Sequence, residues 1–224
     1  MSILIRHMRR FLCIVLLGCI GSAAAASADR SDDVTSFFRA VQMDDATTVK
    51  RMIAARALGP NAIDPRSGEP ALIVALREGS NRVIDALLAE PAIDLEVNAP
   101  NTNTALMMAA IKHNKPAVVA MLAKGAVVNR PGWTALHYAA ASGDDEIARI
   151  LLRHGARIDA EAPAKFTPLM IAAREGQEST VRLLLEEGAD ATRKNSESLT
   201  AAQIALRADK PRIAADIDAH LAKR

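Results

Sequence analysis

The sequence predicts an all-α fold, a solenoid of about six stacked helix-turn-helix units with short hairpin-like loops. Three observations predict it. Hydrophobic positions recur at a nearly fixed interval, and each interval holds two short helical patterns separated by a turn signal. Half of the 224 residues are hydrophobic although only 3% are aromatic. A core of small aliphatic side chains in thin stacked layers, each touching only its neighbours, fits this composition.

The clearest unit covers residues 132–160. Thr134 is typical of a helix N-cap, because its hydroxyl can accept a bond from an unpaired backbone N–H. A short apolar helix is predicted over about 136–141, and a second, amphipathic helix over about 145–154. Gly155 can adopt the left-handed conformation that ends the second helix. The apolar face of the second helix consists of Ile147, Ile150 and Leu151.

This unit recurs along the chain. The position of Leu136 repeats at intervals of 34, 30, 33 and 33 residues, at Leu72, Leu106, Leu136, Leu169 and Ala202. The first helix of the clearest unit opens with the box Thr-Ala-Leu-His-Tyr-Ala-Ala over 134–140, and two second helices end in Leu-Leu followed by Gly-Ala. A period near 33 with this box resembles the ankyrin repeat, and the resemblance implies four repeats with degenerate ends.

We therefore expect a signal peptide over 1–28 and one repeat domain over 29–224. The expected units are a cap at about 32–65, repeats at about 66–100, 101–129, 130–161 and 162–194, and an end cap at 195–224. The loop before Trp133 is three residues shorter than the usual period, so its hairpin should be clipped. Pro91 stands where glycine usually ends the second helix, which predicts an irregular turn.

The first 28 residues are typical of a secretory signal. Arginines at 6, 9 and 10 precede an apolar run over 11–20, and small residues follow, so cleavage is expected near Ala26 or Ala28. The apolar run is too short to span a bilayer, which takes about 20 residues. Both cysteines, Cys13 and Cys19, lie in this segment, and no Asn-x-Ser/Thr acceptor occurs. We expect a Gram-negative periplasmic protein; the alternative is an envelope protein with a lipid on Cys19, since 16–19 reads Leu-Leu-Gly-Cys.

The formal charge of +2 falls to −1 when residues 1–28 are removed, which leaves 25 basic and 26 acidic residues. Such a chain lacks the bulk positive charge expected of a nucleic-acid binder. We expect a monomer that binds a protein partner, without nucleic acid, a membrane span or a cofactor.

Candidate chemistry is sparse. The histidines after residue 28, His113, His137, His154 and His220, fall at different repeat positions, so stacking should keep them apart. His137 matches the histidine of the family box, which implies bonds within and between neighbouring loops. The acids at 144–146 open a helix, where they favour the dipole. We expect no catalytic residue and no metal site; a small metal-binding or enzymatic factor is the alternative.

The resemblance implies that the residue before each box and the pair ending each first helix face a concave groove. The residues before the box are Glu69, Asn103, Trp133, Phe166 and Leu199. The last three are 33 residues apart and should align as an apolar stripe. Arginines flank this stripe, and aromatic residues with arginines are the composition typical of interface hot spots. Apolar packing against the next loop is the alternative reading. The candidate partner-binding residues are Trp133, Phe166, Leu199, Asn103, Arg77, Lys112, Arg174 and Glu175.

Overall fold

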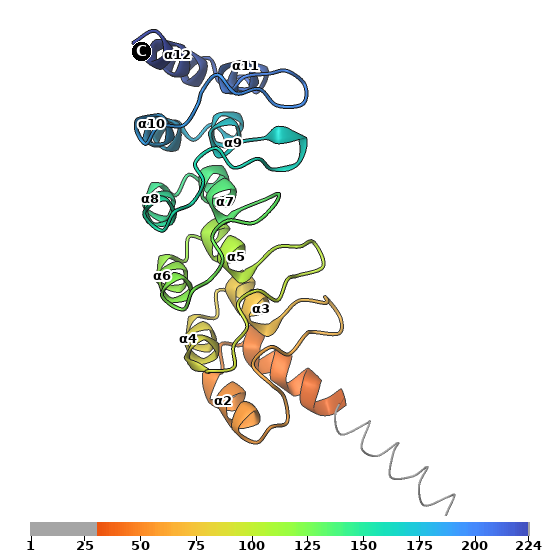
Figure 1. The fold of residues 1–224 in the computed structure, drawn as a ribbon. Coiled ribbons are helices and arrows are strands. Elements are labelled where there is room, and N and C mark those ends of the chain that lie inside the picture. The colour runs from red at the N-terminus through yellow and green to blue at the C-terminus, as the bar shows by residue number, and fades with distance from the viewer. Residues whose placement is uncertain (1–30, 224) are drawn as a thin grey trace, which may run out of the picture.

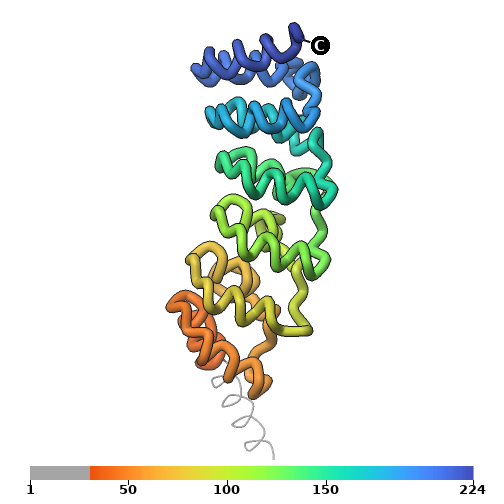
Figure 2. The backbone as a smooth tube through the Cα atoms, turned by 90° about the vertical axis from the view of Figure 1, so that its left-hand side faces the viewer, coloured from red at the N-terminus to blue at the C-terminus, as the bar shows by residue number. Residues whose placement is uncertain are grey.

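The computed structural model describes residues 31–223 and confirms an all-α solenoid of stacked helix-turn-helix units. The predicted signal peptide and Cys19 lie outside the described residues. Figure 1 shows two parallel columns of helices, with the first helix of each pair in the central column and the second beside it. Hairpin-like loops project from the central column on the side away from the second helices. Figure 2 shows the pairs as successive layers from the N-terminal to the C-terminal end.

The described chain starts in a helix that continues to residue 42 and is paired with α2, Ala46–Ala54. The later first helices are α3 (Ala71–Glu78), α5 (Ala105–Ile111), α7 (Ala135–Ser142), α9 (Pro168–Glu175) and α11 (Ala201–Arg207). The later second helices are α4 (Asn81–Ala89), α6 (Lys115–Ala123), α8 (Asp145–Arg153), α10 (Glu178–Glu186) and α12 (Pro211–Leu221). A 3-10 turn, η1 (Pro163–Lys165), lies in the loop before α9.

The turn between the two helices of each unit uses one left-handed residue. This residue is Asp44, Gly79, His113, Gly143, Gly176 or Asp209, with φ between 54° and 85°. Glycine adopts this conformation freely, and Asp and His are the side chains that tolerate it better than most. The chain thus reverses at the same register position in every unit, whatever the residue there.

Second helices end less uniformly. Gly125, Gly155 and Gly188 follow α6, α8 and α10 with positive φ, as the left-handed cap requires. At Pro91 the chain departs from this pattern as predicted: α4 stops at Ala89, and Glu90 is extended with φ −68° and ψ 129°. Proline fixes φ near −65° and cannot take the left-handed conformation, so this loop leaves the helix in another direction.

The core is continuous through the stack. First helices are buried on both sides, and residues 168–173 of α9 are all buried. Leu136, Leu151 and Leu169, the box and second-helix leucines, are each at most 1% exposed. Alanine supplies many of the contact positions, which is how the chain builds a core with few aromatics. Among the described residues no helix is long and apolar enough to cross a membrane.

Polar side chains join adjacent hairpin loops at four junctions. Each accepts a backbone N–H of the following loop, 28 to 33 residues later. The pairs are Asn61 with Asp94, Glu96 with Val127, Asn129 with Arg157, and Asp159 with Asp190, at 2.8 to 3.1 Å. These bonds satisfy loop N–H groups that no helix or strand would satisfy, and they fix the spacing between layers.

The buried leucines give the first prediction. Leu151→Ala should lower the free energy of unfolding by about 2 to 5 kcal/mol, because Leu151 is fully buried between layers and its truncation leaves a cavity. The matched control is Leu206→Ala, whose side chain is 56% exposed and whose truncation should change stability by no more than about 0.5 kcal/mol. Urea unfolding followed by circular dichroism measures both. Equal effects of the two substitutions would contradict the register.

Candidate binding surface

The residue before each box is presented in the same way throughout the stack. It directly follows a left-handed residue in the hairpin: Gly68, Thr102, Gly132, Lys165 or Ser198. In four of the five hairpins its carbonyl also accepts a backbone N–H from four or five residues earlier, at 2.8 to 3.0 Å. These carbonyls belong to Glu69, Asn103, Phe166 and Leu199. The shortened loop before Trp133 shows no such bond, consistent with a clipped hairpin.

Trp133 lies in an aromatic cluster. Its ring makes an edge contact with His137, with centroids 5.4 Å apart, and a tilted contact with Tyr138 at 5.9 Å. The Tyr138 hydroxyl donates to Asn103 Oδ1 at 2.7 Å and so joins two repeats. Trp133 is partly buried, as are Phe166 and Leu199, so the short loop does not leave it fully exposed.

His137 connects the Trp133 cluster to the next repeat. Its Nδ1 accepts the backbone N–H of Thr134 at 3.2 Å and lies 2.9 Å from the Thr134 hydroxyl. Nε2 therefore carries the proton and donates to the backbone carbonyl of Phe166 at 3.1 Å. Burial lowers the pKa of His137 to about 4, so the ring is neutral at pH 7. The imidazole thus contacts the Trp133 ring and is hydrogen-bonded to the backbone of Phe166, so it connects the two residues.

Phe166 and Leu199 line one pocket of about 370 Å³ between the last repeat and the end cap. Ile204 and Ala208 complete its apolar part, and Arg174, Arg207, Asn195 and Glu197 supply the polar groups. The Arg174 guanidinium carbon lies 5.4 Å from the Phe166 ring centroid, a cation–π contact, and its Nε donates to Glu175 at 2.9 Å. Arg207 forms an ion pair with Glu197. Three of the predicted residues are therefore brought together here.

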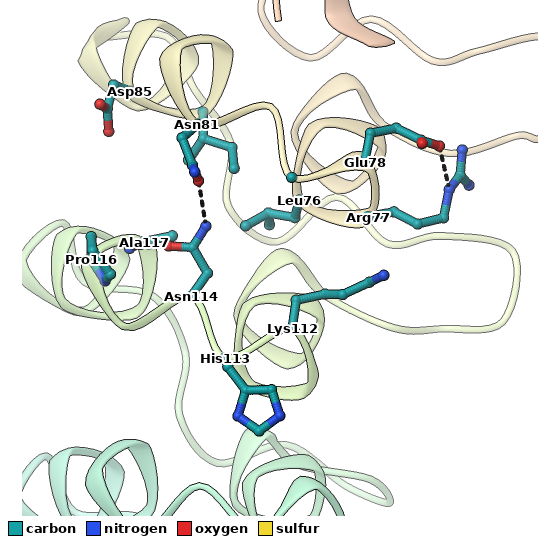
Figure 3. Close-up of a pocket in the computed structure, with 12 residues that line it drawn as sticks. Leu76, Arg77, Glu78, Asn81, Asp85, Lys112, His113, Asn114, Pro116 and Ala117 are labelled. Atoms are coloured by element: carbon teal, nitrogen blue, oxygen red, sulfur yellow. Dashed lines mark hydrogen bonds and ion pairs between the residues drawn. The ribbon is translucent and has the colours of Figure 1, made fainter. Parts of the chain in front are cut away.

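The N-terminal half of the surface is more polar. Arg77 pairs with Glu69 and, at 3.1 Å, with Glu78. Lys112 is exposed and makes no ion pair with another described residue. Arg77 and Lys112 border a crevice of about 660 Å³ between the first and second repeats after the N-terminal cap, which Figure 3 shows at the ends of the helix pairs.

The crevice exists because no side chain covers Gly79. A side chain from the next repeat covers two equivalent glycines, since an added Cβ at Gly143 would meet Gln177 and one at Gly176 would meet Lys210. Over Gly79 the equivalent residue is Asn114, which caps Ala117 N–H and donates to Asn81 Oδ1 at 2.9 Å. A Cβ at Gly79 would consequently meet nothing within 4 Å.

The remaining histidines do not converge. His113 Nδ1 lies 2.9 Å from Asp144, and His154 Nδ1 lies 2.9 Å from the Ile150 carbonyl. His220 lies at the far end of the stack, in α12. Within residues 31–223 no three His, Cys, Asp or Glu side chains come together in a way that could hold a metal ion.

The eight predicted residues thus fall into three places along the stack: Arg77 and Lys112 at the crevice, Asn103 and Trp133 at the aromatic cluster, and Phe166, Arg174, Glu175 and Leu199 at or beside the pocket. Sequence reasoning missed Tyr138, Asn195 and Glu197. Tyr138 lies in the family box five residues after Trp133, the equivalent of Asn103 in the next repeat, a signal that could have found this pair. For Asn195 the sequence carries no comparable signal.

The model of the family "Ankyrin repeats (3 copies)" matches residues 37–131, 92–162 and 120–195. These matches span more than half of the chain, and the chain belongs to the ankyrin repeat family. It is also similar to human transient receptor potential cation channel subfamily A member 1, with 33% identity over 119 residues. That alignment covers 52% of this chain but 10% of the relative, so the chain matches only a short part of that protein.

His137 gives a prediction about pH. Its pKa is about 4 in the fold and about 6.5 when unfolded, so between these values only the unfolded chain binds the proton. Stability should therefore fall as the pH drops from 6.5 to 4, by up to about 3 kcal/mol from this residue. His137→Gln should remove that part of the pH dependence.

The chain itself offers the precedent for this substitution. Gln203 occupies the equivalent position in α11, and its Oε1 accepts the Thr200 N–H at 2.9 Å, so glutamine replaces the Nδ1 bond without titrating. Urea midpoints of both proteins at pH 7 and pH 4.5 make the measurement. A variant with the same loss of stability between the two pH values would contradict this assignment.

Proposed function

We propose that this protein is a non-enzymatic scaffold that binds a protein partner along the stripe formed by Trp133, Phe166 and Leu199. The observation that carries the proposal is the pocket between Phe166 and Leu199, which stands in the same register as Trp133. Family membership supports it, because ankyrin repeats suggest a protein-interaction scaffold. Stacked repeats are preorganised, so little conformational entropy is lost when a partner binds.

The arrangement of the stripe favours an interface over simple packing. All three side chains are partly buried, and Phe166 and Leu199 line their pocket together with the exposed Arg174 and Arg207. Aromatic residues and arginine are the side chains most enriched among binding hot spots. The exposed ion pairs at the rim contribute only about 0 to 1 kcal/mol each, so a partner can replace them at small cost.

The stripe is tested by substitution. Trp133→Ala combined with Phe166→Ala should abolish capture of the partner, because truncating an interface anchor typically costs about 2 kcal/mol or more of binding. The Thr134–His137–Phe166 hydrogen bonds use backbone groups at both ends and survive these substitutions, so circular dichroism should change little. Arg174→Glu should weaken capture less and make it more dependent on salt.

The matched control is Met43→Ala combined with Val119→Ala, two exposed apolar side chains away from the stripe. Immobilised full-length protein and its variants are compared for capture from an envelope fraction, followed by mass spectrometry. If the stripe variant captures the same proteins as the control, the stripe is packing and the partner binds another face.

We also propose that the protein is exported to the periplasm as a soluble monomer. The supporting features are the positively charged start, the short apolar run and the small residues near Ala26 and Ala28. Expression of the full chain in a Gram-negative host should yield a periplasmic form that begins close to Ser27 or Asp29, as measured by N-terminal sequencing and intact mass. A lipid-modified Cys19 at the new terminus would establish the anchored alternative, and an uncleaved cytoplasmic chain would refute export.

A further inference from the structure

Asn195 is the least expected group in the Phe166–Leu199 pocket. Its side chain is only 5% exposed, and Oδ1 accepts the backbone N–H groups of Glu197 and Leu199, each at 3.0 Å. These two donors establish which end of the amide is the oxygen. The other end, Nδ2, has no hydrogen-bond partner among the described residues, although Asn195 lines the pocket. Nδ2 is not itself buried away from solvent, so it is a fixed donor that water or a ligand in the pocket can satisfy.

Most of the other polar groups in and around the pocket are also donors. Arg174 and Arg207 add guanidinium donors, and Glu197 is the single carboxylate in the lining. Lys165 and Lys194, on the two loops that frame the pocket, are exposed and form no ion pair with another described residue. Carboxylates bind guanidinium groups in strong, charge-assisted hydrogen bonds. The polar side of the pocket is therefore complementary to a negatively charged acceptor.

The rest of the lining is apolar. Phe166 and Leu199 come from two loops, Ile204 from α11, and Ala208 from the C-terminal cap of α11. The volume of about 370 Å³ lies at the lower end of the range for ligand pockets, about 300 to 1,000 Å³. One branched or aromatic side chain, with its adjoining backbone, is an occupant of suitable size.

We infer that this pocket binds a segment of the protein partner in which one leucine- or phenylalanine-sized side chain is flanked by Asp or Glu. The inference rests on the proposed function and specifies the partner's chemistry at one end of the stripe. The apolar side chain lies against Phe166 and Leu199. A flanking carboxylate accepts hydrogen bonds from Asn195 Nδ2 and from Arg174 or Arg207, exchanging the exposed pairs that these arginines make with Glu175 and Glu197.

The test uses blocked, dye-labelled seven-residue peptides with a Gly/Ser background and different central triplets. Fluorescence anisotropy with the full-length protein gives the dissociation constant of each peptide. The Glu-Leu-Glu peptide should bind about tenfold tighter than Lys-Leu-Lys and than Glu-Gly-Glu, because each loses either the charge or the apolar contact. Equal or tighter binding of either comparison peptide would overturn the inference.

Asn195→Asp is the most informative variant. It keeps the oxygen that accepts the two backbone N–H groups but replaces the Nδ2 donor with a negatively charged oxygen. Binding of the Glu-Leu-Glu peptide should weaken by about tenfold. Lys50→Gln makes the same change in net charge on the exposed face of α2, at the other end of the stack, and should leave binding unchanged. Unchanged binding by Asn195→Asp, with an unchanged urea midpoint, would refute the role of Asn195.

Two further outcomes separate this inference from the proposed function. A peptide that ends in leucine with a free carboxylate, if it binds more tightly than Glu-Leu-Glu, assigns the pocket to a chain terminus and overturns the internal segment. Partner capture that depends on the stripe, without any preference for acidic peptides, refutes this inference alone. Selective binding of acidic peptides without stripe-dependent capture instead refutes the proposed function.

Discussion

The structure depends on one constraint: no unit can bury its own apolar faces. In α9 the six residues 168–173 are buried because α7 packs on one side and α11 on the other. An isolated pair of seven- to nine-residue helices would expose that surface, and helices this short are marginal in water. Stability therefore resides at the junctions between units, and a uniform repeat register is the condition under which every junction can form.

This constraint explains why polar groups are placed where they are. The buried box threonines cap first helices, with Thr104 and Thr167 accepting N–H groups of Met107 and Met170 at 3.2 and 3.3 Å. Thr134 is different, because its hydroxyl lies against His137 Nδ1. There the ring accepts the Thr134 N–H within its own repeat and donates to the Phe166 carbonyl of the next, at the cost of holding a neutral, fully buried histidine.

The sequence was sufficient for features that depend on a residue and its own backbone. The box leucines, the left-handed glycine after α8 and the irregular turn at Pro91 follow from periodicity and from the limits on φ. Features that depend on the orientation of a side chain in a neighbouring repeat could not be predicted from the sequence. The crevice at Gly79 exists because Asn114 bonds Asn81 and Ala117 while Gln177 and Lys210 cover their glycines, and all three side chains are polar residues at the same register position.

The two ends of the candidate surface differ in the groups that contact their arginines. Near α3 the carboxylates of Glu69 and Glu78 both contact Arg77, so the charged groups before the helix and at its C-terminal end satisfy one another. Near α9 and α11 the residues before the box are Phe166 and Leu199, which offer the arginines no carboxylate at that position. Arg174 instead lies over a ring, and both arginines pair with exposed acids in sequence-local contacts. Toward the C-terminal end the apolar residues before the box thus leave each arginine with an exposed carboxylate partner, whereas Arg77 also pairs with the less exposed Glu69.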